Sequence, residues 1–312
     1  MKIAFIIDPF ASLNPKKDST LELIRAAELR HHNSAVIEQQ QLQLINNQVM
    51  GTGKQVFFND KEGHYLGESF TQPLSHFDAV FMRVDPPLNM NYIVTTYLLE
   101  KAEKEGVLVL NKPNSLRTFN EKLSTTLFPE FTPPLMVSSL PEEIKDFVAT
   151  HEEVILKPLD AMGGSGIFKV TSKDPNLNVI LETMTQDSSR SIMAQRFIPA
   201  IKEGDKRVLV INGEVAEHAL ARIPKQGETR GNLAAGGLGV AMPLTEQERK
   251  IATTLAPFLK ENGLFIVGLD VIGNYLTEIN ITSPTCMREI RDQTGEDIAL
   301  KTILALETHL SH

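Results

Sequence analysis

The first 120 residues alternate between short apolar runs and helical segments, and this alternation restricts the fold more than any other feature of the chain. Apolar runs at 2–7, 78–83 and 107–110 are typical of buried parallel strands. Helices are predicted over 19–30 and 91–105. The alternation therefore predicts a small Rossmann-like α/β domain. Dinucleotide binding is only weakly supported, because no Gly-x-Gly-x-x-Gly follows the first strand.

The size, charge and cysteine content exclude several classes of protein. With 312 residues, the chain can form two or three packed domains. A net charge of −8 argues against a general nucleic-acid-binding protein. The one cysteine, Cys286, rules out an intrachain disulfide, which is typical of a cytosolic chain. No stretch approaches the ~20 apolar residues of a membrane helix. The apolar start is also too short for a signal peptide. We therefore expect a cytoplasmic protein that binds neither nucleic acid nor membrane.

The stretch from Gly268 to Thr285 is predicted to form two strands around a turn. Glu278 and Asn280 are two positions apart, so their side chains point to the same face of the second strand. Carboxylate and amide oxygens are the kind of ligand that Mg²⁺ takes in nucleotide enzymes. Asp270 joins them only if the turn has three residues, because a two-residue turn places Asp270 and Glu278 on opposite faces. The alternative is the polar face of an ordinary hairpin.

Two lysines and a glycine-rich turn are candidates for a phosphate site. Lys157 lies in an apolar strand, where lysine seldom occurs without a partner. The turn at 163–166 follows it, and such a turn lets backbone N–H groups approach an anion closely. The turn is not a Walker A loop, and glycine-rich turns often only connect strands. Because Lys122 lies upstream as a second lysine, a phosphate site is the favoured interpretation.

A second hairpin, residues 206–222, can direct two arginines into one site. Its Asn-Gly turn at 212–213 is typical of a two-residue type I′ turn. In that register Arg207 pairs with His218, and Arg222 lies on the same face four residues further along. The planar guanidinium group suits phosphate oxygens. The alternative is two exposed arginines on a solvated sheet face.

Two further segments complete the candidate site. The strand at 193–198 offers main-chain groups that could pair with a flat base. The stretch at 224–239 is rich in small residues and holds Arg230, and a loop of this length is usually disordered or a functional lid. As a lid, it could close Arg230 over a reacting group.

Three helix boundaries can also be predicted. Ser19 with Glu22 and Thr245 with Glu248 match the Ser/Thr-x-x-Glu pattern of a capping box at the start of a helix. The last helix is predicted over 296–310.

Taken in chain order, these candidates indicate phosphoryl transfer. Lysines and glycine amides hold phosphates, carboxylates hold Mg²⁺, and arginines stabilise a transferring phosphoryl group. No serine, cysteine or histidine has the setting of a covalent nucleophile. The chemistry would therefore depend mainly on electrostatics and positioning.

The order and the sequences of these segments resemble those of the ATP-grasp superfamily, and within it those of the bacterial-type glutathione synthetases. The resemblance covers nearly the whole chain. The most specific motifs of this resemblance are Glu228-Thr-Arg-Gly-Asn-Leu-Ala-Ala-Gly-Gly237 and Thr277-Glu-Ile-Asn-Ile-Thr-Ser-Pro-Thr285. The other matching segments are 83–87, 111–117, 120–122, 155–159 and 204–207.

The resemblance implies an α/β (α+β) ATP-grasp fold in three parts. These are an N-terminal Rossmann-like (pre-ATP-grasp) domain over 1–121, a small lid domain over 122–198 and a C-terminal catalytic domain over 199–312. It implies that γ-L-glutamyl-L-cysteine, glycine and ATP give glutathione, ADP and phosphate through an acyl phosphate. Water would destroy that intermediate, so the loop at 225–239 is expected to close over it. A homo-oligomer, either a dimer or a tetramer, is also implied.

The same resemblance implies a role for each candidate residue. ATP is the co-substrate, and two Mg²⁺ ions, or Mn²⁺ in their place, are the cofactor. The expected nucleotide-binding residues are Lys122, Lys157, Gly163, Gly164, Ser165, Gly166, Gln195, Phe197, Ile198 and Asp205. The expected metal ligands are Asp270, Glu278 and Asn280. The expected catalytic residues, which stabilise the γ-phosphoryl group and the acyl phosphate, are Arg207, Arg222 and Arg230. The expected substrate contacts are Arg83, Ser283, Pro284 and Thr285.

Two other functions remain open from the sequence. One is another ATP-grasp carboxylate–amine ligase, similar to D-alanine–D-alanine ligase or to a glutamate-adding ligase. The other is an ATP-binding regulatory protein without turnover, against which the intact set of arginines and acidic residues argues. Cys286 is expected to be a buried spectator, because this chemistry needs no enzyme thiol.

Overall fold

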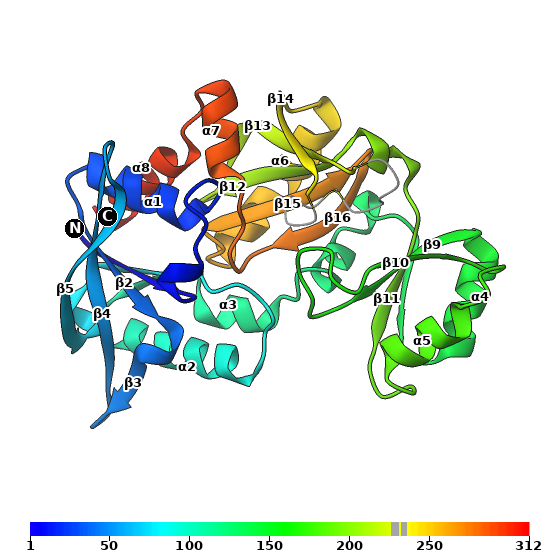
Figure 1. The fold of residues 1–312 in the computed structure, drawn as a ribbon, viewed down its shortest axis with the longest axis horizontal. Coiled ribbons are helices and arrows are strands. Elements are labelled where there is room, and N and C mark those ends of the chain that lie inside the picture. The colour runs from blue at the N-terminus through cyan, green and yellow to red at the C-terminus, as the bar shows by residue number, and fades with distance from the viewer. Residues whose placement is uncertain (226–230, 232–235, 312) are drawn as a thin grey trace.

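The computed structural model describes residues 1–225, 231 and 236–311. Within them, three β-sheets with their helices are arranged along the long axis of the molecule (Figure 1). The expected α/β (α+β) class is thus confirmed. No helix in these residues is both long and apolar enough to cross a lipid bilayer.

The first sheet has seven strands in the order β3-β4-β2-β1-β6-β7, with β5 paired to β4. The strands are β1 (Lys2–Ile7), β2 (Asn33–Glu38), β3 (Leu42–Ile45), β4 (Gln48–Asn59), β5 (Gly63–Pro73), β6 (Ala79–Met82) and β7 (Leu108–Leu110). The helices of this part are α1 (Ser19–Leu29), α2 (Met90–Lys104) and α3 (Pro113–Thr118). As predicted, β1, β6 and β7 are buried parallel strands. Both faces of β1 are covered, because Ile3 and Phe5 pack with α1 while Ala4 and Ile6 pack with α2.

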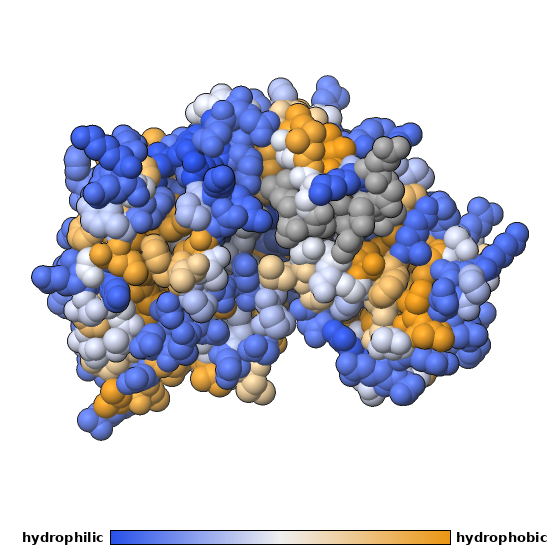
Figure 2. Space-filling model, in the orientation of Figure 1, coloured by the Kyte–Doolittle hydropathy of each residue, from blue (hydrophilic) through white to orange (hydrophobic). Residues whose placement is uncertain are grey.

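The second sheet has four strands in the order β10-β9-β11-β8 and forms a separate lobe. Its elements are β8 (Leu135–Ser138), α4 (Pro141–His151), β9 (Glu153–Pro158), β10 (Phe168–Thr171), α5 (Leu177–Thr185) and β11 (Ile192–Arg196). It has a hydrophobic cluster of its own around Val154, Leu156 and Leu181. In the space-filling view a notch at the lower edge separates this lobe from the rest (Figure 2).

The third sheet has five antiparallel strands in the order β14-β13-β12-β15-β16. Its elements are β12 (Asp205–Ile211), β13 (Glu214–Ile223), β14 (Leu238–Pro243), α6 (Glu246–Glu261), β15 (Ile266–Ile272), β16 (Tyr275–Asn280), α7 (Met287–Thr294) and α8 (Ile298–Leu310). The last helix agrees with the prediction for 296–310, whereas α7 was not predicted. Helix α8 packs against α1, so the two ends of the chain lie together (Figure 1).

The first and third sheets share their hydrophobic core. Phe5 of β1 lies in one cluster with Leu209 and Ile211 of β12, and Ile6 lies in another with Val210. Each of the three sheets takes its strands from one of the ranges 1–121, 122–198 and 199–312. The division into domains at those boundaries stays a prediction.

The helix starts agree only partly with the capping patterns. Thr245 and Glu248 form the predicted capping box at the start of α6. The predicted box of Ser19 with Glu22 is wrong, because Asp18 is the N-cap of α1 and its side chain accepts from the N–H groups of Thr20 and Leu21. The hydroxyl of Ser19 serves a different helix, as described below.

Candidate active site

The hairpin β15–β16 places Asp270 directly opposite Glu278, as the metal hypothesis requires. The predicted reason is wrong: the turn contains only residues 273 and 274, which on its own would put the two acids on opposite faces. Instead the register shifts by one residue next to Asp270, and Thr277 is the extra residue of a β-bulge. The hydroxyl of Thr277 donates to the carbonyl oxygen of Asp270 at 3.1 Å, which holds the bulge in place.

The hairpin β12–β13 brings Arg207 and Arg222 to one face, as predicted. Its turn at 212–213 has φ angles of 49° and 83°, which agrees with type I′. The predicted pairing of Arg207 with His218 is wrong, because the register shifts between Val208 and Val210 and Arg207 faces Leu220. The shift adds two residues to β13, an even number, so the face on which Arg222 lies is unchanged.

The sheet order unites these two hairpins, because β12 lies between β13 and β15. Asp270 accepts from Nε and Nη2 of Arg207 at 2.6 and 3.1 Å, and its Oδ2 lies 2.8 Å from Nη2 of Arg222. Arg222 also donates to Asp205 at 2.6 Å. Burial alone would raise the pKa of Asp270, but the charges of Arg207 and Arg222 outweigh it and hold that pKa well below its usual value. Asp270 is therefore ionised and holds both guanidinium groups in place.

Asp205 is the second acid of this cluster, and one of its carboxylate oxygens has no hydrogen-bond partner among the described residues. Burial raises the pKa of Asp205 to about 6, against the opposing charge of Arg222. At pH 7 this carboxylate is therefore ionised, but it can take up a proton under mildly acidic conditions.

This pKa predicts how stability changes with pH. Between pH ~4 and pH ~6 the folded protein keeps a proton on Asp205 that the unfolded chain has released, so the free energy of unfolding decreases as the pH rises across that window. The slope from this one group is at most about 1.4 kcal/mol per pH unit. We expect urea unfolding at pH 4.5 and 6.5 to show the decrease in the wild type relative to Asp205→Asn. A difference between the two proteins that does not change with pH would contradict it.

A first cavity lies between the second and third sheets, with about 790 Å³ of empty space that includes open solvent. Most of the expected nucleotide-binding residues line it: Lys122, Lys157, Gly163, Gly164, Ser165, Gln195, Phe197, Ile198 and Asp205. Gly166 is not among the lining residues. It has a φ of +67° next to Pro158, so it shapes the turn rather than the wall.

The polar groups of this first cavity are oriented for a ligand. Nζ of the buried Lys157 donates to Oε1 of Gln195 at 2.8 Å, and burial lowers the pKa of Lys157. Because a lysine ammonium only donates, it fixes the orientation of the Gln195 amide. Nε2 of Gln195 is then buried with no partner among the described residues. An unpaired buried donor on a residue that lines a cavity is a candidate partner for an acceptor atom of a ligand.

A second cavity, with about 1540 Å³ of empty space that includes open solvent, shares Glu278 and residues 161–163 with the first. Arg207, Arg222, Asn280, Ser283, Pro284 and Thr285 line it, together with Asp8, Lys17 and Asp85 from the first part of the chain. Asp85 lies just beyond the carboxyl end of the buried strand β6. Cys286 lines this cavity, but it is completely buried, as expected.

Arg83 lies behind the wall of the second cavity rather than in it. It is buried, its Nε donates to the hydroxyl of Thr20 at 3.1 Å, and its Nη2 donates to the carbonyl oxygen of Pro284 at 3.0 Å. Arg230 lies outside the described residues, as does most of the loop at 225–239. Gly231 is described and lines the first cavity.

Two residues of the site are not among the candidates that the sequence indicated. Glu121 is partly buried and lines the second cavity, and its Oε1 accepts from the N–H groups of Ile281 and Thr282 at 2.9 and 3.1 Å. Gly268 lets Arg207 pass over the strand, because a Cβ there would lie 2.6 Å from Cδ of Arg207. A glycine inside a strand is the usual signal of such a close approach, and that signal is present in the sequence.

The oxygen donors at the junction of the cavities suit a divalent cation. Asp270 and Glu278 face each other, and Asn280 lies on the same face with its amide NH2 turned to the carbonyl oxygen of Gly268 at 3.2 Å. Nowhere in the described part of the chain do three His, Cys, Asp or Glu side chains form a metal centre on their own. Two carboxylates and one amide leave coordination positions for phosphate oxygens, which is how Mg²⁺ is usually held in phosphoryl-transfer sites.

Comparison with known proteins agrees with this geometry. Residues 1–117 match the model "Prokaryotic glutathione synthetase, N-terminal domain", and residues 121–295 match "Prokaryotic glutathione synthetase, ATP-grasp domain". The chain is 52% identical to glutathione synthetase of Nitrosomonas europaea, over 100% of this chain and 99% of the relative. It is 50% identical to that of Pseudomonas putida, over 99% and 98%.

Among solved structures, D-cycloserine synthetase DcsG superimposes with a TM-score of 0.71 at 15% identity, over 99% of this chain and 100% of that one. The ATP-grasp ligase PsnB with its minimal precursor gives a TM-score of 0.66 at 18% identity, with 98% of both chains covered. At these identities the likeness shows the fold alone. The family models and the full-length relatives show more: the chain belongs to the prokaryotic glutathione synthetase family.

Proposed function

We propose that this protein joins γ-glutamylcysteine to glycine at the expense of ATP, giving glutathione, ADP and phosphate. The geometric observation that carries the proposal is the meeting of two cavities at Glu278, with Arg207 and Arg222 beside it. A nucleotide in the first cavity would thereby direct its terminal phosphate toward a substrate in the second. Full-length identity of about half to relatives named glutathione synthetase supports this assignment.

The reaction follows from the weak electrophilicity of a carboxylate. The cysteinyl carboxylate oxygen attacks the γ-phosphorus of ATP, ADP leaves, and an acyl phosphate forms. The amine of glycine then attacks the acyl carbon, the bond from that carbon to the phosphate oxygen breaks, and phosphate and a proton are released. Arg207 and Arg222 would stabilise the charge that develops on the phosphoryl oxygens, and Arg230 would join them when the lid closes.

The nucleotide would lie in the first cavity. Lys122 and Lys157 would bind its phosphates, and the turn Gly163–Gly166 would cover them. Nε2 of Gln195 would donate to the base, beside Phe197 and Ile198, and Asp205 would reach the ribose. Asp270, Glu278 and Asn280 would hold Mg²⁺ (two ions, or Mn²⁺ in their place), which neutralises phosphate charge when bound.

The peptide substrate would occupy the second cavity. Ser283, Pro284 and Thr285 form part of its wall and would contact γ-glutamylcysteine or the glutathione product. Arg83 would act on that contact through the carbonyl group of Pro284. We also propose that the protein is cytoplasmic, that it forms a homo-oligomer (a dimer or a tetramer), and that its domains divide at 121/122 and 198/199.

One assay tests the proposed function. ADP release is measured with ATP, Mg²⁺ and γ-glutamylcysteine, with and without glycine. We expect ADP to accumulate steadily only when both peptide and glycine are present. No glycine-dependent release would overturn the proposal, and release that requires D-alanine would point to a different ligase.

A further inference from the structure

Helix α7 begins without a cap of its own. Its N-cap residue, Cys286, has a φ of +91° and makes no capping hydrogen bond with its side chain. The first helical N–H group, that of Met287, instead donates to the hydroxyl of Ser19 at 3.2 Å, and Ser19 is completely buried in the first turn of α1. The start of α7 is therefore held by a helix almost 270 residues away in the sequence.

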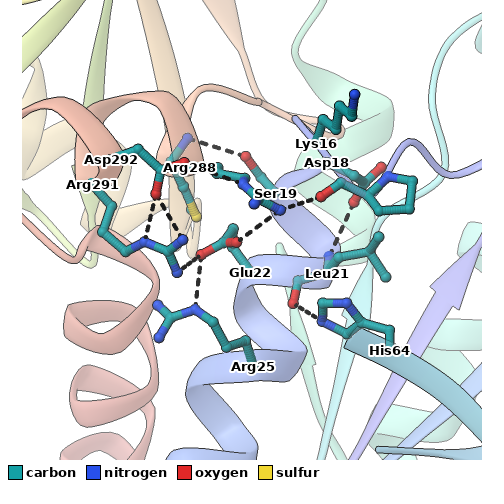
Figure 3. Close-up of polar contacts among 12 residues, drawn as sticks. Lys16, Asp18, Ser19, Leu21, Glu22, Arg25, His64, Arg288, Arg291 and Asp292 are labelled. Atoms are coloured by element: carbon teal, nitrogen blue, oxygen red, sulfur yellow. Dashed lines mark hydrogen bonds and ion pairs between the residues drawn. The ribbon is translucent and has the colours of Figure 1, made fainter. Parts of the chain in front are cut away.

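The same first turn of α1 reinforces this contact through Glu22 (Figure 3). Glu22 is 2% exposed, and its carboxylate accepts from Nε of Arg25 at 2.9 Å and from Nη1 of Arg291 in α7. Nη1 of Arg288, also in α7, lies 3.9 Å from the other carboxylate oxygen. One buried acid thus faces three guanidinium groups, two of which belong to α7.

These contacts hold two walls of the second cavity. Residues 283–286 form one wall and lead directly into α7. Thr20, between Ser19 and Glu22, binds Arg83, and Arg83 binds the carbonyl oxygen of Pro284. Residues 12–14 and 17–18 lie on another side of the same cavity, and Arg288 donates to the carbonyl oxygen of Pro15 within that loop.

We propose that the first turn of α1, through Ser19, Thr20 and Glu22, positions the 283–286 wall and thereby sets the affinity for the peptide substrate. None of these three side chains lines either cavity in the described residues, so they act as positioning residues. The identity of the peptide as γ-glutamylcysteine rests on the proposed function, whereas the positioning itself does not.

The test compares Glu22→Gln with Glu307→Gln. Glu307 is the control, because it also ties the end of α1 to a later helix, through an ion pair with the C-cap residue Arg30, and neither residue lines the second cavity. Glu22→Gln leaves three guanidinium groups around a neutral amide. We expect the KM of γ-glutamylcysteine to rise about tenfold, the effect of losing one charge-assisted contact. The KM of ATP should stay unchanged, and Glu307→Gln should behave as the wild type.

Hydrogen exchange provides a second measurement that needs no turnover. In Glu22→Gln and in Ser19→Ala we expect faster amide exchange over 283–290 than in the wild type and in Glu307→Gln. Ser19→Ala removes only one hydroxyl, so it decides the question even if Glu22→Gln does not fold. Unchanged exchange and an unchanged peptide KM would overturn the inference. If the wild type itself releases no glycine-dependent ADP, the proposed function fails while exchange still tests the positioning.

Discussion

Glu278→Gln is expected to reduce glycine-dependent ADP release by at least about 100-fold at saturating ATP, because a bound metal ion supplies several kcal/mol of charge stabilisation. Glu278 faces both cavities, and Nζ of Lys122 lies 3.4 Å from its carboxylate. Both oxygens of Asp270 are bonded to guanidinium groups, so Glu278 is the carboxylate at this junction that is better placed to bind a cation. Glutamine keeps the shape of the side chain and removes the charge.

The measurement titrates Mg²⁺ against turnover and records thermal unfolding of the same samples. We expect a higher Mg²⁺ requirement for Glu278→Gln with little change in the melting temperature, because the side chain is partly exposed and no core packing is lost. Glu214→Gln is the control, since Glu214 is an exposed acid of the same sheet, outside both cavities. Turnover close to that of the wild type, or a loss of activity that only follows unfolding, would exclude a metal role for Glu278.

Arg222→Met is expected to lower the free energy of unfolding by about 3–5 kcal/mol, the usual cost of removing one partner from a buried ion pair. Arg222 is 4% exposed and bridges Asp205 and Asp270. Asp270 keeps Arg207 in this variant, whereas Asp205 loses the guanidinium group that it accepts from. Turnover should be lost as well, because Arg222 lines the second cavity beside Arg207.

Adding Asp205→Asn to Arg222→Met separates the electrostatic cost from lost packing. The double variant should recover part of the stability, with a coupling of about 0.5–3 kcal/mol, because the amide carries no unpaired charge. Urea unfolding at pH 7.5 provides the comparison, and Arg249→Met, which changes an exposed arginine of α6, is the control. A loss of stability in Arg222→Met no larger than in this control, or simple additivity of the two substitutions, would contradict a buried ion-pair role for Arg222.

Much of the fold could be predicted because its signals are local. The buried strands at 2–7 and 107–110 were recognisable as apolar runs, and the turn at 212–213 by its Asn-Gly pair. Side-chain direction along a strand depends only on parity, so the shared face of Glu278 and Asn280 followed directly. Helix α7 has no such signal, because its start is held by Ser19 of another helix.

Register was the part that local patterns could not specify. The pairing of Asp270 with Glu278 was expected from a longer turn, but a bulge at Thr277 produces it. The partner of Arg207 was misplaced by two residues for the same reason. A bulge adds a residue to one strand only, so the register depends on the partner strand, which the side-chain pattern of a single strand does not specify.

The sequence alone determined which residue types are present and which of them share a face of a strand. The resemblance of its motifs to those of the ATP-grasp superfamily indicated the family. Only the tertiary structure decided that Asp270 is held by Arg207 and Arg222, since this depends on β12 lying between β13 and β15. It also decided that Arg83 supports the cavity wall from behind. The physical reason is the same in both cases: hydrogen bonds and charges act across space between segments far apart in the chain, and neither composition nor periodicity records which segments become neighbours.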